Sequence, residues 1–340
     1  MADERVESNR IQLDPEIFKD ASVFESESIE LLANYRKKSI AIRTTGILMI
    51  VIIAVLALRG KGFPMADPGN HSLPFFLGAG IIALMGILSK HAYRPVRRFK
   101  QKIKFDFGNR VLWHYGDGIE LRREGASESE FRYALKDIAP QYDRYSSEDL
   151  VKGEIKGTDF QFYEVELQKK QETDTKGHRR TSYKTVFRGH VLSIHLNRQY
   201  QGYIRIKADS LGNRLFPDKD LIRLESPEFE KLFDVYADDQ ISSRTILTPS
   251  FMERLTELAQ SPTLTSGRKL NRPAFRATIK NDYINLMIKT RGNRFDIKDD
   301  GKQVHLKTYA MAIQEEMKAI IHCIEGFQVG ADLITLSRYD

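Results

Sequence analysis

Residues 40–58 read IAIRTTGILMIVIIAVLAL, an apolar run whose only charged side chain is Arg43, one turn from its start. A helix needs about 20 apolar residues to cross a hydrocarbon core of roughly 30 Å, and an arginine this close to the end can extend to the head groups. A second apolar run, LPFFLGAGIIALMGIL, follows at residues 73–88. Its proline lies in the first turn, where a helix tolerates it. The two runs predict a transmembrane hairpin within residues 39–90.

Two other structures can contain such runs. Amphipathic helices of a soluble domain carry polar residues on one face, whereas these runs are nearly free of polar residues on every face. A cleaved signal peptide lies at the N-terminus and ends in a small-residue cleavage site. The first run instead begins at residue 40, after an acidic N-terminal segment. A membrane anchor therefore remains the prediction.

Lysine and arginine residues crowd the outer flanks of the two runs. Arg36, Lys37, Lys38 and Arg43 flank the first run, while the connecting loop holds only two basic residues. Cytoplasmic flanks carry the excess of lysine and arginine, so both termini are expected in the cytoplasm, in a multi-pass membrane protein. The single cysteine, Cys323, fits a reducing compartment.

We call residues 90–104 the basic collar. The formal net charge of the chain is +7, and the collar alone carries seven basic residues and no acidic one. The rest of the chain is therefore neutral, which argues against nucleic-acid binding. Each cation close to an anionic leaflet contributes on the order of 1 kcal/mol to the free energy of membrane binding. The expected partners are therefore anionic membrane lipids, bound at Lys90, Arg94, Arg97, Arg98, Lys100, Lys102 and Lys104.

Composition divides the chain into five parts. The N-terminal segment is acidic, and Asp14–Pro15 is a typical start for an amphipathic helix that continues into the membrane. This acidic N-terminal segment either is solvated or folds onto the basic collar or a partner. The expected parts are the acidic N-terminal segment (1–38), the hairpin (39–90), a basic juxtamembrane part that is the collar without Lys90 (91–104), a cytoplasmic domain (105–330) and a tail (331–340).

Beyond residue 153 the sequence alternates apolar and polar residues in the manner of β-strands. Strands are expected in GEIKGTDFQFYEVELQ (153–168), TVFRGHVLSIHLN (185–197) and GYIRIKA (202–208). The polar segment 169–184 is expected to form a long, mobile hairpin tip between the first two. Two further strands, in AFRATIK and YINLMIK, meet at Asn281–Asp282, a dipeptide suited to a tight hairpin.

Helices are predicted in the second half of the chain. Ser226–Pro227 and Thr248–Pro249 are typical helix starts, and apolar residues at helical spacing predict a last helix from Thr308 to Glu325. Strands and helices follow one another without regular βαβ alternation, which indicates an α+β class. The predicted architecture is a two-helix transmembrane hairpin followed by a cytoplasmic antiparallel-sheet domain with packed helices.

Three segments resemble a known family. They are YDRYSSEDLVKGEIKGTDFQFYEVELQ from Tyr142, TKGHRRTSYKTVFRGHVL from Thr175, and SPEFEKLFDVYADDQISSRTILTPSFMERL from Ser226. Their order and spacing resemble a bacterial family catalogued as domain of unknown function 3137, over roughly residues 95–290. The resemblance implies two membrane helices and a cytoplasmic C-terminal domain. It implies no activity, cofactor or catalytic residue.

The residues offer little catalytic chemistry. No nucleophile or phosphate-binding motif is found, no pair of histidines has the spacing of a zinc site, and one cysteine excludes thiolate clusters. No metal and no cofactor is therefore expected. Paired carboxylates can perform acid–base chemistry or hold a divalent cation, although Ser147 before Glu148 resembles a helix or turn cap and a structural ion-pair network explains the acids equally well. The candidate catalytic residues are Asp143, Arg144, Tyr145, Glu148, Asp238 and Asp239.

These observations favour a protein without enzymatic activity. The leading interpretation is a membrane-anchored protein whose cytoplasmic domain is an interaction or regulatory module for another membrane or cytoplasmic protein. One alternative is a membrane-tethered, hydrolase-like enzyme that uses the carboxylate clusters. Another is a lipid-binding or transport accessory protein, whose sheet holds an apolar ligand.

Overall fold

The structure is a computed structural model of the chain, and it forms two compact units. The first unit comprises residues 1–107 and 296–309, and the second comprises residues 108–295 and 310–340. Each unit is described by itself. The residues that the structure describes are 15–58, 72–116, 118–175, 178–196, 200, 202–208, 220–260, 273, 275–290 and 295–336.

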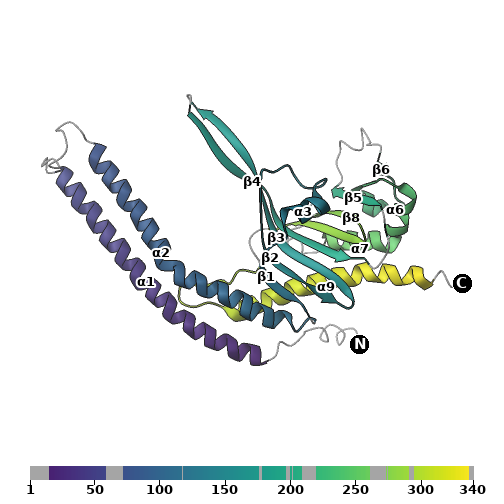
Figure 1. Ribbon diagram of the computed structural model, residues 1–340, viewed down its shortest axis with the longest axis horizontal. Helices are drawn as coiled ribbons and strands as arrows, with labels where there is room; N and C mark the ends of the chain where they lie inside the picture. The colour runs from purple at the N-terminus through teal and green to yellow at the C-terminus, as the bar shows by residue number, and fades with distance from the viewer. Residues whose placement is uncertain are drawn as a thin grey trace. The chain divides into compact units, whose positions relative to one another are not determined.

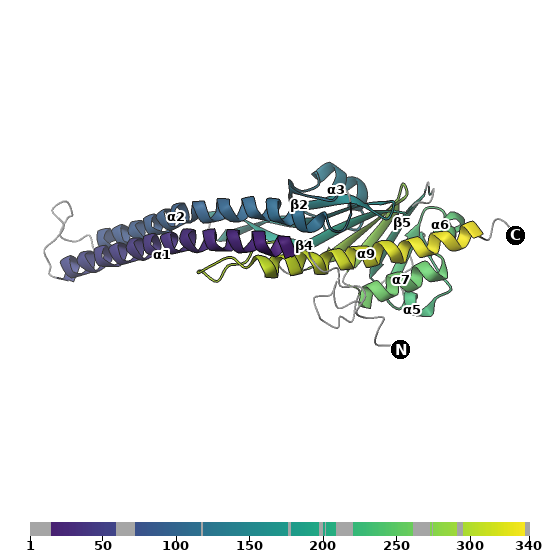
Figure 2. The same ribbon diagram turned by 90° about the horizontal axis from the view of Figure 1, so that it is seen from below.

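Two long helices make up most of the first unit. Helix α1 spans Pro15–Leu58 and helix α2 spans Ser72–Leu112, and they lie side by side in both views (Figures 1 and 2). Both are longer than the predicted apolar spans, because the acidic N-terminal residues continue α1 backwards and the basic collar continues α2 forwards, with Pro95 inside the helix. Pro15 is the first residue of α1, as predicted, and Asp14 lies outside the described residues.

The apolar sections of both helices are exposed. Each contains an 18-residue stretch that is long and apolar enough to cross a membrane, of which 11% is buried in α1 and none in α2. Ile47, Leu48, Ile82 and Ile87 are all more than half exposed. A helix that forms the core of a soluble domain buries its apolar residues instead. The two helices therefore have the composition and exposure of membrane spans.

Small and aromatic side chains bring α1 and α2 together. A Cβ atom added to Gly46 would lie 2.0 Å from the Met85 sulfur, so the glycine leaves the space that Met85 fills. Further along, Tyr35 and Tyr93 meet edge to face with their ring centroids 5.0 Å apart. By contrast, a Cβ atom at Gly86 would meet nothing within 4 Å. The helices thus meet along one face of each.

Residues 296–309, which we call the strap, also belong to the first unit. The Val304 N–H donates to Ser28 Oγ at 3.0 Å, and the Leu306 N–H donates to Glu25 Oε1 at 2.7 Å. The Arg36 guanidinium donates to the Gly301 carbonyl at 2.7 Å. The strap lies inside the range expected for the cytoplasmic domain, 105–330, and yet it packs on the helices that precede that domain in sequence.

The second unit is built on an antiparallel sheet. Among the described residues the sheet has nine strands in the order β1-β2-β3-β4-β9-β8-β5-β7-β6. The strands are β1 (Glu120–Glu124), β2 (Arg144–Ile155), β3 (Thr158–Thr175), β4 (His178–His195), β5 (Tyr203–Ala208), β6 (Leu221–Ile222), β7 (Phe233–Ala237), β8 (Phe275–Lys280) and β9 (Tyr283–Lys289).

Helices cover both faces of the sheet. Figure 2 shows α3 on one side and α9 with α7 on the other. Helix α3 begins with a capping box between Ser127 and Glu130, and its Phe131 and Leu135 pack against Val165, Val191 and Met287. The α+β class is confirmed. The helices are α3 (Glu128–Leu135), α5 (Pro227–Glu230), α6 (Gln240–Ile246), α7 (Pro249–Gln260) and α9 (Leu306–Leu336).

The β8–β9 hairpin has the tight turn that its sequence predicts. Asn281 and Asp282 both have positive φ angles, 46° and 65°. Two such residues in succession make the turn whose twist matches that of the flanking strands, and asparagine and aspartate adopt this conformation more readily than other residues. The sequence therefore fixes the register of this hairpin.

Residues 169–184, expected as a long, mobile hairpin tip, do form a hairpin, but its two sides are paired strands and not loop. Strands β3 and β4 stay paired from Lys169↔Lys184 to Thr175↔His178, beyond the last residue of β3 that pairs with β2, Gln168. We call this ribbon the arm; it is about 20 Å long at the usual rise per residue and projects from the sheet (Figure 1). Lys176 and Gly177, expected at the tip, lie outside the described residues.

Cross-strand contacts explain why the arm is strand and not loop. Arg144 in β2 stacks over the Tyr183 ring with its guanidinium carbon 3.3 Å from the ring centroid. Polar residues face each other at Gln171↔Ser182 and Glu172↔Thr181. Such pairs stabilise a ribbon without an apolar core. The polar composition that suggested a loop reflects the exposure of both faces.

Replacing Gly46 by leucine tests the contact between α1 and α2. We expect Gly46→Leu to destabilise the helix pair by about 1–3 kcal/mol, because the new side chain overlaps Met85. The measurement is thermal unfolding of the full-length protein in detergent micelles. Gly86→Leu is the matched control and should have little effect. Met85→Ala added to Gly46→Leu should restore part of the loss, and equal effects of the two glycine variants would contradict the packing.

Candidate functional site

The structure does not bring the predicted carboxylates together. Asp143 precedes β2 and Glu148 lies within it, whereas Asp238 and Asp239 follow β7. Five strands, β3, β4, β9, β8 and β5, separate β2 from β7 in the sheet. At about 4.8 Å per strand the two groups lie about 29 Å apart. They cannot act on one substrate atom.

The residues around β2 make structural contacts. The Asp143 carboxylate accepts a hydrogen bond from the Lys170 N–H at 2.6 Å, and Arg144 stacks on the arm. The Tyr145 hydroxyl donates to the Ala126 carbonyl at 2.8 Å. Burial raises the pKa of Tyr145 to about 12, so the phenol stays protonated and remains a donor. These three side chains fasten the arm and the α3 segment to the sheet.

Glu148 belongs to β2, and not to a helix. It lies opposite Glu164 in the register of β2 and β3. The expectation that Ser147 caps a helix or turn is wrong, because Ser147 is also a β2 residue and its hydroxyl donates to the Glu164 carbonyl at 2.9 Å. A bulge follows in β2, with Asp149 at a φ of 57°. The run of polar residues in SSED thus marks an irregular strand.

Asp238 and Asp239 organise the end of β7. The Asp238 carboxylate accepts from the Tyr203 N–H at 2.9 Å. Asp239 is the N-cap of α6 and accepts from the N–H groups of Ile241 and Ser242. Hydrogen bonds from Ser242 and from the Ile241 N–H lower the pKa of Asp239. Asp239 is therefore held in the charged form, and both carboxylates accept hydrogen bonds from backbone N–H groups.

The histidines and the cysteine occupy ordinary structural positions. His190 is buried, its Nδ1 lies 3.1 Å from the Thr290 hydroxyl, and its ring stacks on Phe162. Cys323 is buried in α9, and burial raises the pKa of its thiol to about 12, so it is not a thiolate at neutral pH. In the part of the chain that the structure describes, no group of three or more histidine, cysteine, aspartate or glutamate residues is placed to hold a metal ion.

The basic collar divides into two sets of cations. Lys100 pairs with Asp299 of the strap, and the buried Lys104 lies 3.2 Å from Asp296. These two ammonium groups face protein and are not available to lipids. The other five collar cations are exposed, and none of them has an ion pair among the described residues: Lys90, Arg94, Arg97, Arg98 and Lys102.

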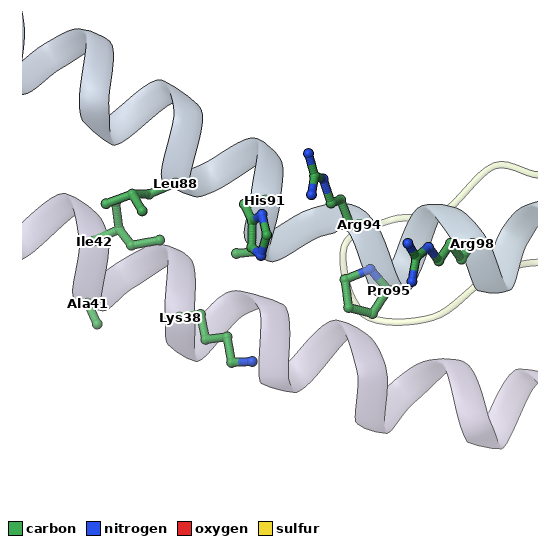
Figure 3. Close-up of a pocket in the computed structure, with 9 residues that line it drawn as sticks. Lys38, Ala41, Ile42, Leu88, His91, Arg94, Pro95 and Arg98 are labelled. Carbon is green, nitrogen blue, oxygen red and sulfur yellow. The ribbon is translucent and has the colours of Figure 1, made fainter.

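A groove opens between α1 and α2 at the end of their apolar sections. Its volume is about 550 Å³. In Figure 3, Ile42 and Leu88 lie between the two helices at one end, and His91 and Pro95 point from α2 toward α1. The lining residues are Lys38, Ala41 and Ile42 of α1 and Leu88, His91, Ala92, Arg94, Pro95 and Arg98 of α2.

The lining of the groove combines apolar walls with positive charge. Three of its residues, Lys38, Arg94 and Arg98, are cations, and none is an acid. The guanidinium of Arg94 turns away from α1 and that of Arg98 extends along α2 (Figure 3). Pro95 has no N–H to donate to the His91 carbonyl one turn earlier, so α2 has a missing hydrogen bond beside the groove. The arrangement suits an amphiphile with a negative group.

The groove and the strap were not found from the sequence. The basic residues of the collar were identified, but their division depends on contacts between residues nearly 200 positions apart, such as Lys104 with Asp296. The pattern DIKDDG at residues 296–301 predicts only a polar turn. The small residues Ala41 and Ala92 and the internal Pro95 were the available signals for a gap between the helices.

Comparisons with known proteins agree with the family resemblance. Residues 185–329 match the model of a family described as "Protein of unknown function (DUF3137)". This range begins and ends further along the chain than the expected 95–290, and it extends into α9. No curated protein matches the chain.

Among solved structures, a crystal structure of the mycobacterial trehalose monomycolate transport factor A, TtfA, is similar. It aligns over 62% of this chain and 90% of that chain, with 10% sequence identity and a TM-score of 0.30. At this level of similarity the alignment supports no conclusion about what the present chain does.

Acidification tests the contact of the strap with the collar. Burial alone would raise the pKa of Asp299, but Lys100, the Gly301 N–H and Tyr93 together hold it below its ordinary value. Stability from this carboxylate is therefore present above the unfolded pKa of about 4 and is lost as the pH falls through the lower, folded value. We expect the protection factor of the Val304 amide, its exchange rate relative to that of an unfolded chain at the same pH, to fall over that range.

The variant Asp299→Asn removes the charge without removing the side chain. At neutral pH it should accelerate exchange at Val304 about fivefold, which corresponds to about 1 kcal/mol for one partly exposed ion pair, and it should flatten the acid dependence. Asp106→Asn, at an exposed position of α2, is the control. An unchanged acid response in Asp299→Asn would show that another group holds the strap.

Proposed function

We propose that this chain, whose residues 185–329 belong to the DUF3137 family, is a membrane-anchored interaction or regulatory protein without enzymatic activity. In this proposal α1 and α2 cross the inner (plasma) membrane of a bacterium, both termini are cytoplasmic, and the sheet domain binds another membrane or cytoplasmic protein. The observation that carries the anchoring is the exposure of two apolar helical sections in one chain.

The charge distribution supports the orientation. Basic residues precede the apolar section of α1 and follow that of α2, on the same side of the hairpin. Lysine and arginine in short flanks stay on the cytoplasmic side. The segment between the helices has few charges and belongs on the opposite side.

The arm supports the interaction role. A two-stranded ribbon is only marginally stable by itself, and this one extends beyond both neighbouring strands of the sheet, β2 and β9. Its backbone edges and its charged side chains are therefore available to a partner, for which strand addition is a common mode of recognition. The candidate carboxylates, in contrast, are separated and engaged in backbone contacts, which weakens the alternative of a tethered hydrolase.

A pair of serine-to-cysteine variants tests the anchoring and the orientation. In a Cys323→Ala background, Ser72→Cys marks the first residue of α2, and Ser182→Cys marks an exposed position in the arm. An impermeant maleimide applied to intact cells should label the first variant and not the second. Permeabilised cells, the control, should show labelling of both.

Either of two results would contradict this topology. Labelling of Ser182→Cys alone in intact cells would reverse the orientation. Protection of both positions until the cells are permeabilised would place both ends of α2 on the cytoplasmic side, and the hairpin would not span the membrane.

Photo-crosslinking tests the role of the arm. A photoreactive residue at Ser182 should give a discrete protein adduct in native membranes, because the arm is proposed to contact the partner. The same residue at Ile241, which is 82% exposed on α6, is the control and should not give that adduct. Replacing residues 169–184 by Asn-Gly should abolish co-purification of the protein identified in that adduct and shift the melting temperature of the domain by no more than about 2 °C, since the ribbon buries no core. Adducts to lipid alone would contradict an interaction module.

A further inference from the structure

We propose that the groove between α1 and α2 is a binding site for one anionic phospholipid. Its phosphate would lie at the basic end of the groove, which Lys38, Arg94 and Arg98 line, and the first carbons of its acyl chains would lie against Ile42 and Leu88. This inference rests on the proposed membrane anchoring and goes beyond it, because it distinguishes a bound lipid at one site from general attraction of the collar to a charged surface.

The position of the groove along the helices matches a phospholipid head group. The predicted apolar runs end at Ile40 in α1 and at Leu88 in α2, and both ends lie at the groove. Arg94 follows Leu88 by six residues, which is about 9 Å along a helix. The head-group layer on each side of a bilayer is about 5–8 Å thick. The change from apolar to basic lining therefore occurs where a lipid changes from acyl chain to phosphate.

Charge complementarity selects the class of lipid. The lining carries three cations and no acid. Asp299 and Asp296 of the strap are engaged with Lys100 and Lys104, which lie outside the groove, and Asp300 lies near His305. Guanidinium groups hold phosphate through two parallel hydrogen bonds. A lipid with a net negative head group is favoured over a zwitterionic lipid, whose own ammonium group the same cations repel.

Size and shape support a single bound molecule. The volume of about 550 Å³ lies within the range of small-molecule sites, about 300–1,000 Å³. Ala41 and Ala92 contribute small side chains to the lining, and Ile42 and Leu88 lie between the two helices at the apolar end of the groove (Figure 3). The groove holds a phosphoglycerol head and the start of the chains, while the rest of each chain remains in the surrounding hydrocarbon.

Two double variants with equal charge separate the site from the surface. Arg94→Gln with Arg98→Gln removes two cations that line the groove, and Arg97→Gln with Lys102→Gln removes two exposed collar cations that do not. The full-length protein in detergent is mixed with phosphatidylglycerol or with phosphatidylcholine, and the bound lipid is counted by native mass spectrometry.

The wild-type protein should retain one phosphatidylglycerol in preference to phosphatidylcholine. The groove pair should lower this retention about tenfold, because it removes the charge-assisted hydrogen bonds to the phosphate. The control pair should lower it by less than about threefold. Equal losses for the two pairs, or equal retention of the two lipids by the wild-type protein, would overturn the proposal.

A steric variant tests the groove without changing its charge. Ala92→Phe fills the space beside His91 and should reduce phosphatidylglycerol retention, whereas Ala83→Phe, at an exposed position of the apolar section, should not. Glycerol 3-phosphate at millimolar concentration should not displace the lipid, because it lacks the acyl chains. Full displacement would show that the groove binds a soluble phosphate and not a phospholipid.

The outcome is independent of the cysteine-labelling result. Loss of the site in these experiments leaves the topology of the hairpin unaffected, and a reversed topology leaves the lipid count in detergent unaffected. Failure of the lipid site and failure of the proposed anchoring therefore give different results.

Discussion

The apolar sections of α1 and α2 impose the main physical constraint on this molecule. Exposed apolar surface in water costs roughly 25 cal/mol per Å², and the side chains involved include many large aliphatic residues, such as Ile47, Ile82 and Ile87. The sheet domain has a core of its own, which includes Phe131, Leu135 and Val165. Hydrocarbon is the medium that the composition of the exposed apolar sections fits.

The strap neutralises part of the positive charge of the collar. The collar has seven cations, equal to the formal charge of the whole chain, but Lys100 and Lys104 face Asp299 and Asp296 within the helical unit. These two therefore contribute to the cohesion of that unit. The five remaining cations are of two kinds, since Arg94 and Arg98 line the groove and the others lie on the open surface. The collar cations thus fall into three groups: two pair with the strap, two line the groove, and three lie on the open surface.

Much of the architecture was predictable from local patterns, and the functional surfaces were not. The hairpin follows from two apolar runs, and the β8–β9 turn follows from Asn281–Asp282, because each depends on residues close in sequence. The arm was missed because polar residues indicate a loop unless cross-strand partners are known, and Arg144 with Tyr183 is such a pair. The grouping of Asp143 with Asp238 in one candidate site failed because strand order cannot be read from composition. The groove depends on the alignment of two helices, to which Gly46 and Pro95 contribute.

The strand order also has a consequence for synthesis on the ribosome. The first four strands pair in sequence, but the second edge of β4 pairs with β9, where His190 lies opposite Ile288. Some 94 residues separate the end of β4 from the end of β9, so at 5–20 residues per second β4 waits on the order of 5 to 20 s for its partner. The apolar helices emerge long before this. The nascent chain thus carries half a sheet with one open edge during this time, the state in which strands of neighbouring chains most readily join.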